Sequence, residues 1–130
     1  MRSPDFVRCA LLALTAAGCA PSPVEVCQRM VDQMCDRTFE CRTDKDTSEF
    51  QTTYGLTVGD CKAKFYIANG CSRRESAEQN CTGPNAGESH FDAGRFAACQ
   101  EALGELSCRQ YLDQNAGSQT PPSECLDVCR

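Results

Sequence analysis

The sequence has few of the residues that favour β-strands, and it lacks a long apolar run. Valine and isoleucine are scarce, and no segment alternates β-branched residues over the length of a strand, so a β-sheet is not expected. The most apolar stretch, residues 9–17, has about half of the roughly 20 residues that a membrane-spanning helix needs. These absences predict a mainly α fold, and they indicate that residues 9–17 do not span a membrane.

The chain also lacks a basic region. Its formal net charge is -5, and no basic cluster is longer than Arg73-Arg74. A nucleic-acid partner is therefore not expected, because contacts to phosphates require concentrated positive charge. The same acidic balance argues against electrostatic binding to anionic lipid headgroups. Only a covalent anchor would hold such a body at a membrane.

Residues that carry chemistry are few. The only histidine, His90, lies between Ser89 and Asp92, but a catalytic Ser-His-Asp arrangement needs three groups that converge in space, which neighbours in sequence rarely do. Common hydrolase signatures are absent, and no Cys-x-x-Cys offers a zinc site or a haem attachment. We expect no enzyme, no cofactor and no metal, and no small-molecule substrate can be identified.

Cysteine is the residue that the chain has in abundance, with 12 copies. This density is typical of disulfide-rich proteins of oxidising compartments, in which cross-links compensate for a small core. We expect disulfides among ten of them: Cys27, Cys35, Cys41, Cys61, Cys71, Cys81, Cys99, Cys108, Cys125 and Cys129.

The pairing of these cysteines cannot be deduced, because ten permit roughly 945 arrangements. Cys125 and Cys129 lie one helical turn apart, and they are more plausible partners of two neighbouring helices than of each other. The one pair that we predict is Cys108 with Cys125, which would close the final hairpin.

The N-terminus has the layout of a signal peptide: a short region flanked by Arg2 and Arg8, an apolar stretch, and then small residues. The junction that follows resembles a bacterial lipobox, although Ala16 stands where leucine is usual. The resemblance implies cleavage before Cys19 and a diacylglycerol on its sulfur. It is carried by Leu14-Thr15-Ala16-Ala17-Gly18-Cys19.

Ordinary secretion is the alternative. Cleavage after Ala17 would leave eleven cysteines and so one unpaired thiol, which is unfavourable in an oxidising space. Cleavage after Ala20 would leave ten cysteines, but it is disfavoured because signal peptidases cut poorly when proline, here Pro21, directly follows the cut. The even number of cysteines therefore favours the lipobox.

The resemblance to bacterial lipoproteins also implies sorting to the outer membrane, because residue 20 is alanine and not aspartate. The predicted divisions are a signal peptide (1–18), a lipidated Cys19 with a proline tether (19–26), and a disulfide-rich helical domain (27–130).

The pattern of apolar residues predicts about four to five short helices. They are expected at residues 24–40, at 58–68 behind a Thr57/Asp60 capping box, at 71–81 on the surface, and from the Asp92 N-cap to a bend near Ser107, followed by a turn with Tyr111 and a last turn capped by Ser123. Residues 42–53, 82–89 and 116–122 are predicted loops or linkers. The expected buried positions are Val24, Cys27, Met30, Val31, Met34 and Cys35, then Val58, Cys61, Phe65 and Ala68, then Phe96, Cys99, Leu103 and Leu106.

Several short motifs follow the lipobox in a fixed order: Cys27-x7-Cys35, Phe50-x3-Tyr54-Gly55, Asp60-Cys61, Phe91-Asp92, Cys99, Ala102-Leu103 and Cys108. Their order resembles the small cysteine-rich lipoproteins of myxobacteria, a group without an assigned activity. The resemblance spans most of the chain, and it implies compartment and fold but no functional residue.

Two functions remain open for this sequence. The first is a non-catalytic lipoprotein, exported and lipid-anchored in the bacterial envelope, that contacts an envelope protein. The second is a small disulfide-rich inhibitor or ligand-binding protein, with residues 82–89 as a candidate exposed loop. A pocket in the structure, or tight binding of a protease, would favour the second.

Overall fold

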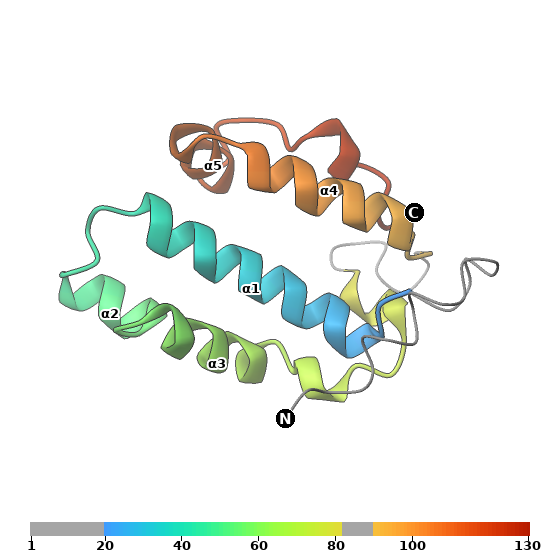
Figure 1. Ribbon diagram of the computed structural model, residues 1–130, viewed down its shortest axis with the longest axis horizontal. Coiled ribbons are helices and arrows are strands. Elements are labelled where there is room, and N and C mark those ends of the chain that lie inside the picture. Colours follow the sequence, from blue (N-terminus) through green and yellow to red (C-terminus); the bar gives the residue numbers. More distant parts are fainter. Residues whose placement is uncertain (1–19, 82–89) are drawn as a thin grey trace, which may run out of the picture.

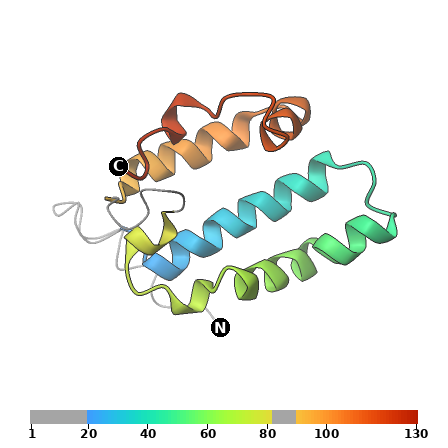
Figure 2. The same cartoon turned by 180° about the vertical axis from the view of Figure 1, so that it is seen from behind.

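The computed structural model describes residues 20–81 and 90–130, and within them the fold is mainly α, as the sequence predicts. Helix α1 runs between two layers, one made of α2 and α3 and the other of α4 and α5 (Figures 1 and 2). The β pairing in these residues is an isolated bridge between Phe91 and Cys129. The elements are α1 (Pro23–Cys41), α2 (Ser48–Tyr54), α3 (Val58–Ala68), η2 (Cys71–Arg73), η3 (Ala77–Asn80), α4 (Ala93–Glu105), α5 (Cys108–Asn115) and η4 (Ser123–Cys125).

Helix α1 begins earlier than the predicted boundary between tether and domain at residues 26 and 27. Ser22 is its N-cap, Pro23 is its first residue, and Ser22 and Glu25 form a capping box. Proline suits this first position because its missing N–H would have no helical partner there. The predicted helix at 24–40 is therefore confirmed to within one residue at each end, and residues 23–26, which the predicted divisions count in the tether, form its first turn.

The predicted loop at residues 42–53 is partly wrong, because it contains most of α2 (Ser48–Tyr54). The hydroxyl of Thr47 caps this helix by accepting a hydrogen bond from the Phe50 N–H at 3.2 Å. The helix ends at Gly55, where φ is 92° and a Cβ atom would lie 2.6 Å from the Cβ of Asp60. Glycine is therefore required at this turn.

The start signals of the next two long helices are confirmed. Thr57 and Asp60 form the capping box of α3, and Asp92 caps α4 by accepting from the Arg95 N–H. The rings of Phe91 and Phe96, with centroids 5.5 Å apart, form the expected hydrophobic staple at the start of α4.

The remaining short segments differ in detail from their predictions. Residues 71–81 form two short 3-10 helices, η2 and η3, instead of one surface helix. Ser107 caps α5, which confirms the bend before it. Ser123 is the first residue of η4 and makes no capping hydrogen bond, and Cys129 lies beyond that turn in the bridge with Phe91. The predicted loop at 82–89 lies outside the described residues.

The buried face of α1 is broader than the predicted stripe. Val26 and Thr38 are buried, whereas Met30 is 40 % exposed and Val24 is half-buried. A helix covered by two layers buries two faces, so a single apolar stripe describes it incompletely.

The other predicted stripes are less buried than expected. On α3 only Cys61 is buried, whereas Val58 and Ala68 are exposed, because α1 covers only one side of this helix. On α4 only Phe96 is buried, and Cys99 and Leu103 are half-buried because they line a cavity.

Five disulfides join the ten cysteines that follow Cys19. The predicted Cys108–Cys125 pair is wrong. Cys108 lies at the start of α5 beside the end of α1, and Cys125 lies over the middle of α4, so each has a nearer partner. Cys125 and Cys129 do not pair with each other, as expected, but only Cys125 reaches a helix, because its partner Cys99 lies on α4 whereas Cys81 follows η3. The bonds are Cys27–Cys71, Cys35–Cys61, Cys41–Cys108, Cys81–Cys129 and Cys99–Cys125.

Candidate functional site

The predicted lipid attachment site, Cys19, lies outside the described residues, as does the predicted signal peptide before it. The structure does describe the chain that follows. The Ser22 N–H donates to the Glu25 carboxylate at 2.7 Å, and the Glu25 N–H donates to the Ser22 hydroxyl at 3.2 Å. The backbone and side-chain hydrogen bonds of Ser22 lower the pKa of Glu25. Three residues, 20–22, therefore separate Cys19 from a capped helix.

Of the three residues in the Ser-His-Asp hypothesis, the structure describes His90 and Asp92. Ser89 lies outside the described residues, and the side chain of His90 is 77 % exposed with its Nδ1 3.8 Å from the Glu78 carboxylate. Asp92 accepts hydrogen bonds from the Arg95 N–H and, at 2.9 Å, from the guanidinium of Arg130. These contacts lower the pKa of Asp92, with the Arg95 backbone as the largest cause. Its carboxylate is engaged in capping α4.

In the basic pair Arg73-Arg74, Arg74 has a structural role. The Arg74 guanidinium donates to the backbone carbonyls of Gln79 at 2.7 Å and of Asn69 at 3.0 Å. These bonds tie the segment around η2 to the segment around η3. Arg74 is therefore committed within the fold and is not a free cation for a ligand.

The face of α1 that meets α2 and α3, here called the α1–α3 interface, is densely packed. It contains the buried disulfides Cys27–Cys71 and Cys35–Cys61. A series of ring contacts extends from it, with centroids 4.8 to 6.0 Å apart. Their members are Phe39, Phe50, Tyr54 and Phe65.

Polar contacts surround this interface. The Tyr66 hydroxyl donates to Asp32, and this hydrogen bond is the largest cause that raises the pKa of Tyr66 to about 12. Lys62 lies 2.8 Å from Asp36, and the hydrogen bond raises the pKa of the lysine.

On the opposite face of α1, here called the α1–α4/α5 interface, three side chains donate hydrogen bonds to backbone carbonyls. Gln33 Nε2 donates to the Gln100 carbonyl at 2.6 Å, and Arg37 donates to the Leu106 carbonyl. The Tyr111 hydroxyl donates to the Met34 carbonyl at 3.3 Å. Near the start of α1, Val26 packs in one hydrophobic cluster with Phe91 and Phe96, and at its end the Cys41–Cys108 disulfide joins α1 to α5.

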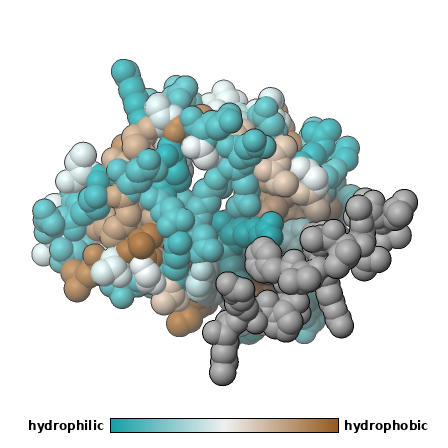
Figure 3. All heavy atoms as spheres, viewed as in Figure 1, coloured by the Kyte–Doolittle hydropathy of each residue, from teal (hydrophilic) through white to brown (hydrophobic). Residues whose placement is uncertain are grey.

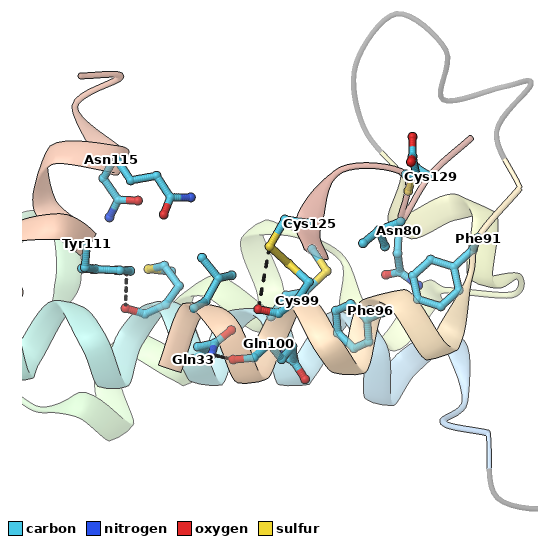
Figure 4. Close-up of a pocket in the computed structure, with 16 residues that line it drawn as sticks. Gln33, Asn80, Phe91, Phe96, Cys99, Gln100, Tyr111, Asn115, Cys125 and Cys129 are labelled. Atoms are coloured by element: carbon cyan, nitrogen blue, oxygen red, sulfur yellow. Dashed lines mark hydrogen bonds between the residues drawn. A yellow bond between two sulfur atoms is a disulfide. The ribbon is translucent and has the colours of Figure 1, made fainter. Parts of the chain in front are cut away.

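A cavity of about 410 Å³ lies at this interface. Its volume falls in the usual range of small-molecule sites. Figure 4 shows Tyr111 and Asn115 at one end, Asn80 and Phe91 at the other, and the Cys99–Cys125 disulfide between them. The lining residues are Met30, Gln33, Met34, Asn80, Phe91, Phe96, Cys99, Gln100, Leu103, Tyr111, Gln114, Asn115, Cys125, Asp127, Val128 and Cys129.

Two oxygens of this lining have no partner within residues 20–81 and 90–130. The Oδ1 of Asn80 and the Oε1 of Gln114 are buried and accept no hydrogen bond from these residues. Burial of such an acceptor without a donor costs about 1–3 kcal/mol, so each marks a place where a hydrogen-bond donor would be stabilised. Sequence reasoning missed both residues because amides in polar segments carry no pattern of their own.

The exposed surface is mostly hydrophilic. On the face shown in Figure 3, hydrophobic residues lie in small separate groups. The most exposed large ones are Ile67 at 80 % and Leu56 at 71 %. Scattered apolar residues of this kind are normal on soluble surfaces, so the cavity is the more specific candidate site.

In residues 20–81 and 90–130, no group of three potential metal ligands is found. The ten cysteines described there are all in disulfides, and a disulfide sulfur is not the thiolate that zinc requires. None of the helices in the same residues is long and apolar enough to cross a membrane.

Comparisons of the chain with protein-family models, curated proteins and solved structures find no match.

Proposed function

We propose that this chain is a non-catalytic lipoprotein of the bacterial envelope, anchored in the outer membrane through a lipid on Cys19, that acts by contact with another envelope protein. The observation that carries the proposal is the start of α1 at Pro23, capped by Ser22. A rigid domain that begins so soon after the lipobox cysteine is suited to display at a membrane surface.

The short connection also supports a preferred orientation. Residues 20–22 reach at most about 10 Å, so the end of the domain that holds the start of α1 would face the bilayer. The start of α4 and the C-terminus lie at this same end, and α2 lies at the other (Figure 1). Along α1 the two ends are separated by about 28 Å. The α2 end is therefore the part most accessible to a partner.

Anchoring is tested with Cys19→Ser in the natural host. The parent is expected in the membrane fraction after carbonate washing, and Cys19→Ser in the soluble fraction. Cys9→Ser is the matched control, because Cys9 lies in the predicted signal peptide, and it should leave the parent's distribution unchanged. Cys19→Ser that stays in the washed membranes would contradict the anchor.

Contact with a partner is tested by photo-crosslinking in intact cells. A crosslinking residue at Leu56, beside α2 and 71 % exposed, should give a specific adduct in the anchored protein and lose it in the Cys19→Ser form. The same residue placed at Arg95, near the start of α4, should not give this adduct. Equal adducts from both positions, or none above background, would count against the proposal.

A second function, ligand binding, is favoured by one specific observation. The cavity at the α1–α4/α5 interface has a volume suited to a small molecule and two unpaired acceptors. It belongs to the domain itself and does not depend on the anchor.

A further inference from the structure

We propose that the cavity between α1 and the α4–α5 layer binds an uncharged small molecule with an apolar body and N–H or O–H groups that donate hydrogen bonds to Asn80 and Gln114. This proposal does not rest on the anchor at Cys19. Its test uses purified protein, so that failure of one proposal leaves the other intact.

The apolar body follows from the walls of the cavity. Met34 and Leu103 come from α1 and α4, Phe96 lies near the start of α4, and the Cys99–Cys125 disulfide crosses the middle (Figure 4). Thioether, aliphatic, aromatic and disulfide groups offer dispersion contacts and few polar ones. A ligand made mainly of polar groups would lose its hydration in this cavity without replacement.

The donor groups follow from the unpaired oxygens. Asn80 is 5 % exposed, and its Nδ2 donates to the Pro23 carbonyl at 3.1 Å. That bond fixes the orientation of the amide, because a flipped amide would place its oxygen against the carbonyl. Oδ1 is thereby held as an acceptor in the cavity wall without a donor.

Gln114 supplies the second acceptor from α5. Its Oε1 is also buried and unpaired, and its neighbour Asn115 lies at the end of the cavity opposite Asn80 (Figure 4). Acceptors contributed by η3 and α5 would position a ligand whose donors lie toward its two ends.

The absence of charge on the ligand follows from the ionisable groups of the lining. Among the lining residues that the structure describes, Asp127 is the only acidic or basic side chain, and its carboxylate lies 3.6 Å from the Arg95 guanidinium. None of these residues is cationic and could pair with an anion, and the acidic group already has a cationic partner. A charged ligand would be desolvated there without compensation.

The test measures binding of N-phenyl-1-naphthylamine, an uncharged apolar amine with one N–H whose fluorescence rises in apolar surroundings. The protein is the full mature chain with Cys19→Ser and intact disulfides, so that no detergent is needed. We expect saturable binding with one site per chain. The charged analogue 1-anilinonaphthalene-8-sulfonate should bind more weakly.

Two variants locate the site. Met30→Trp, at a cavity residue that is 40 % exposed, should fill the space and abolish saturable binding. Ile67→Trp, at a residue 80 % exposed on α3, is the matched control and should bind like the parent. Non-reducing mass spectrometry checks that both variants keep five disulfides. Unchanged binding in Met30→Trp would overturn the proposal.

A third variant tests the hydrogen bond itself and does not depend on a filled cavity. Gln114→Met removes the acceptor and keeps a side chain of similar length. It should weaken the binding of N-phenyl-1-naphthylamine by about three- to tenfold, which corresponds to the loss of one hydrogen bond. It should not weaken the binding of 1-phenylnaphthalene, which has no hydrogen-bond donor. If Gln114→Met changed the affinity of both probes equally, the proposed hydrogen bond to Gln114 would be refuted. If neither probe bound the parent, the cavity would hold only water and the proposal would be overturned.

Discussion

The two faces of α1 are built on different principles. At the α1–α3 interface, buried disulfides and aromatic rings fill the space, and Cys35 and Cys61 have no exposed surface. At the α1–α4/α5 interface, Gln33 and Arg37 reach across to backbone carbonyls and leave a cavity of about 410 Å³ beside them. One face is therefore filled by disulfides and aromatic rings, and the other contains the cavity.

This difference has a physical basis in the disulfides. The bonds Cys27–Cys71 and Cys35–Cys61 lie on the α3 side, whereas Cys41–Cys108 is the one disulfide that joins α1 to the opposite layer. That bond lies at the end of α1, and the hydrophobic cluster of Val26, Phe91 and Phe96 lies near its start. Hydrogen bonds from Gln33 and Arg37 bridge the length between them.

The largest expected effect comes from removal of that cross-link. Cys41→Ala with Cys108→Ala opens a loop of 67 residues, which corresponds to about 4 kcal/mol in the chain-entropy model. Hydrogen exchange should accelerate in α4 and α5 and change little in α3. Denaturant unfolding gives the free energy.

The matched variant, Cys35→Ala with Cys61→Ala, should show the opposite pattern, with faster hydrogen exchange in α3 and little change in α4 and α5. If hydrogen exchange accelerated equally in α3 and in α4 and α5 in both double variants, the two faces would unfold together. The contrast drawn between them would then be wrong.

The second largest effect is expected from Phe50→Ala on the densely packed side. Phe50 is 1 % exposed and contacts the rings of Phe39 and Tyr54, so its truncation should cost about 3 kcal/mol of unfolding free energy. Ile67→Ala, at an exposed position of α3, should change stability by less than about 0.5 kcal/mol. A small effect of Phe50→Ala would indicate that this side is as loosely packed as the other.

The third prediction concerns Arg37, whose side chain is 11 % exposed. Arg37→Met keeps an apolar stem but removes the donor to the Leu106 carbonyl and the contact with the Tyr111 ring, 5.3 Å from the guanidinium carbon. We expect a loss of about 2 kcal/mol. Arg109→Met on α5, where the side chain is 91 % exposed, is the control and should be nearly neutral. Equal losses of unfolding free energy in Arg37→Met and Arg109→Met would mean that only the removed charge matters and that the contacts of Arg37 do not.

The smallest effect is a dependence on alkaline pH that belongs to the α1–α3 interface. The fold raises the pKa of Tyr66 from 10.0 to about 12 through its hydrogen bond to Asp32, so it favours the neutral phenol. This contribution to stability is complete below pH 10 and is lost as the pH rises from 10 to about 12.

Tyr66→Phe should remove this slope, and the difference should be about 0.5 kcal/mol because solvent screens the partly exposed pair. Urea unfolding of both proteins across this pH range measures it. A parallel decline in the two proteins would assign the slope to other groups.

The parts of the fold that the sequence predicts depend on neighbouring residues. Two examples are the staple of Phe91 and Phe96 and the capping box of Thr57 and Asp60. Their residues are at most five positions apart, so the local sequence is enough to predict these contacts. Helix α2 was missed because seven residues are too few to display a period, although Thr47 and Gly55 mark its two ends.

The parts that could not be predicted depend on distant residues. Which cysteine meets Cys108 is decided by the packing of α5 on α1, and the exposure of Met30 is decided by the cavity beneath the α4–α5 layer. Asn80 and Gln114 become neighbours of one cavity only after η3 and α5 are both in place. The lipid on Cys19 and the likeness to myxobacterial lipoproteins stay predictions.

The pairing pattern has a consequence for the biogenesis of the protein. Along the chain no cysteine among the ten bonds to the next one: Cys35–Cys61 is enclosed by Cys27–Cys71, and Cys99–Cys125 by Cys81–Cys129. On the proposed export route, an oxidase that joined cysteines in their order of emergence would link Cys27 to Cys35 first, a bond that the native fold does not contain. Such a pair reaches the native set only by thiol–disulfide exchange, so a disulfide isomerase acting after the oxidase should raise the yield of correctly paired protein.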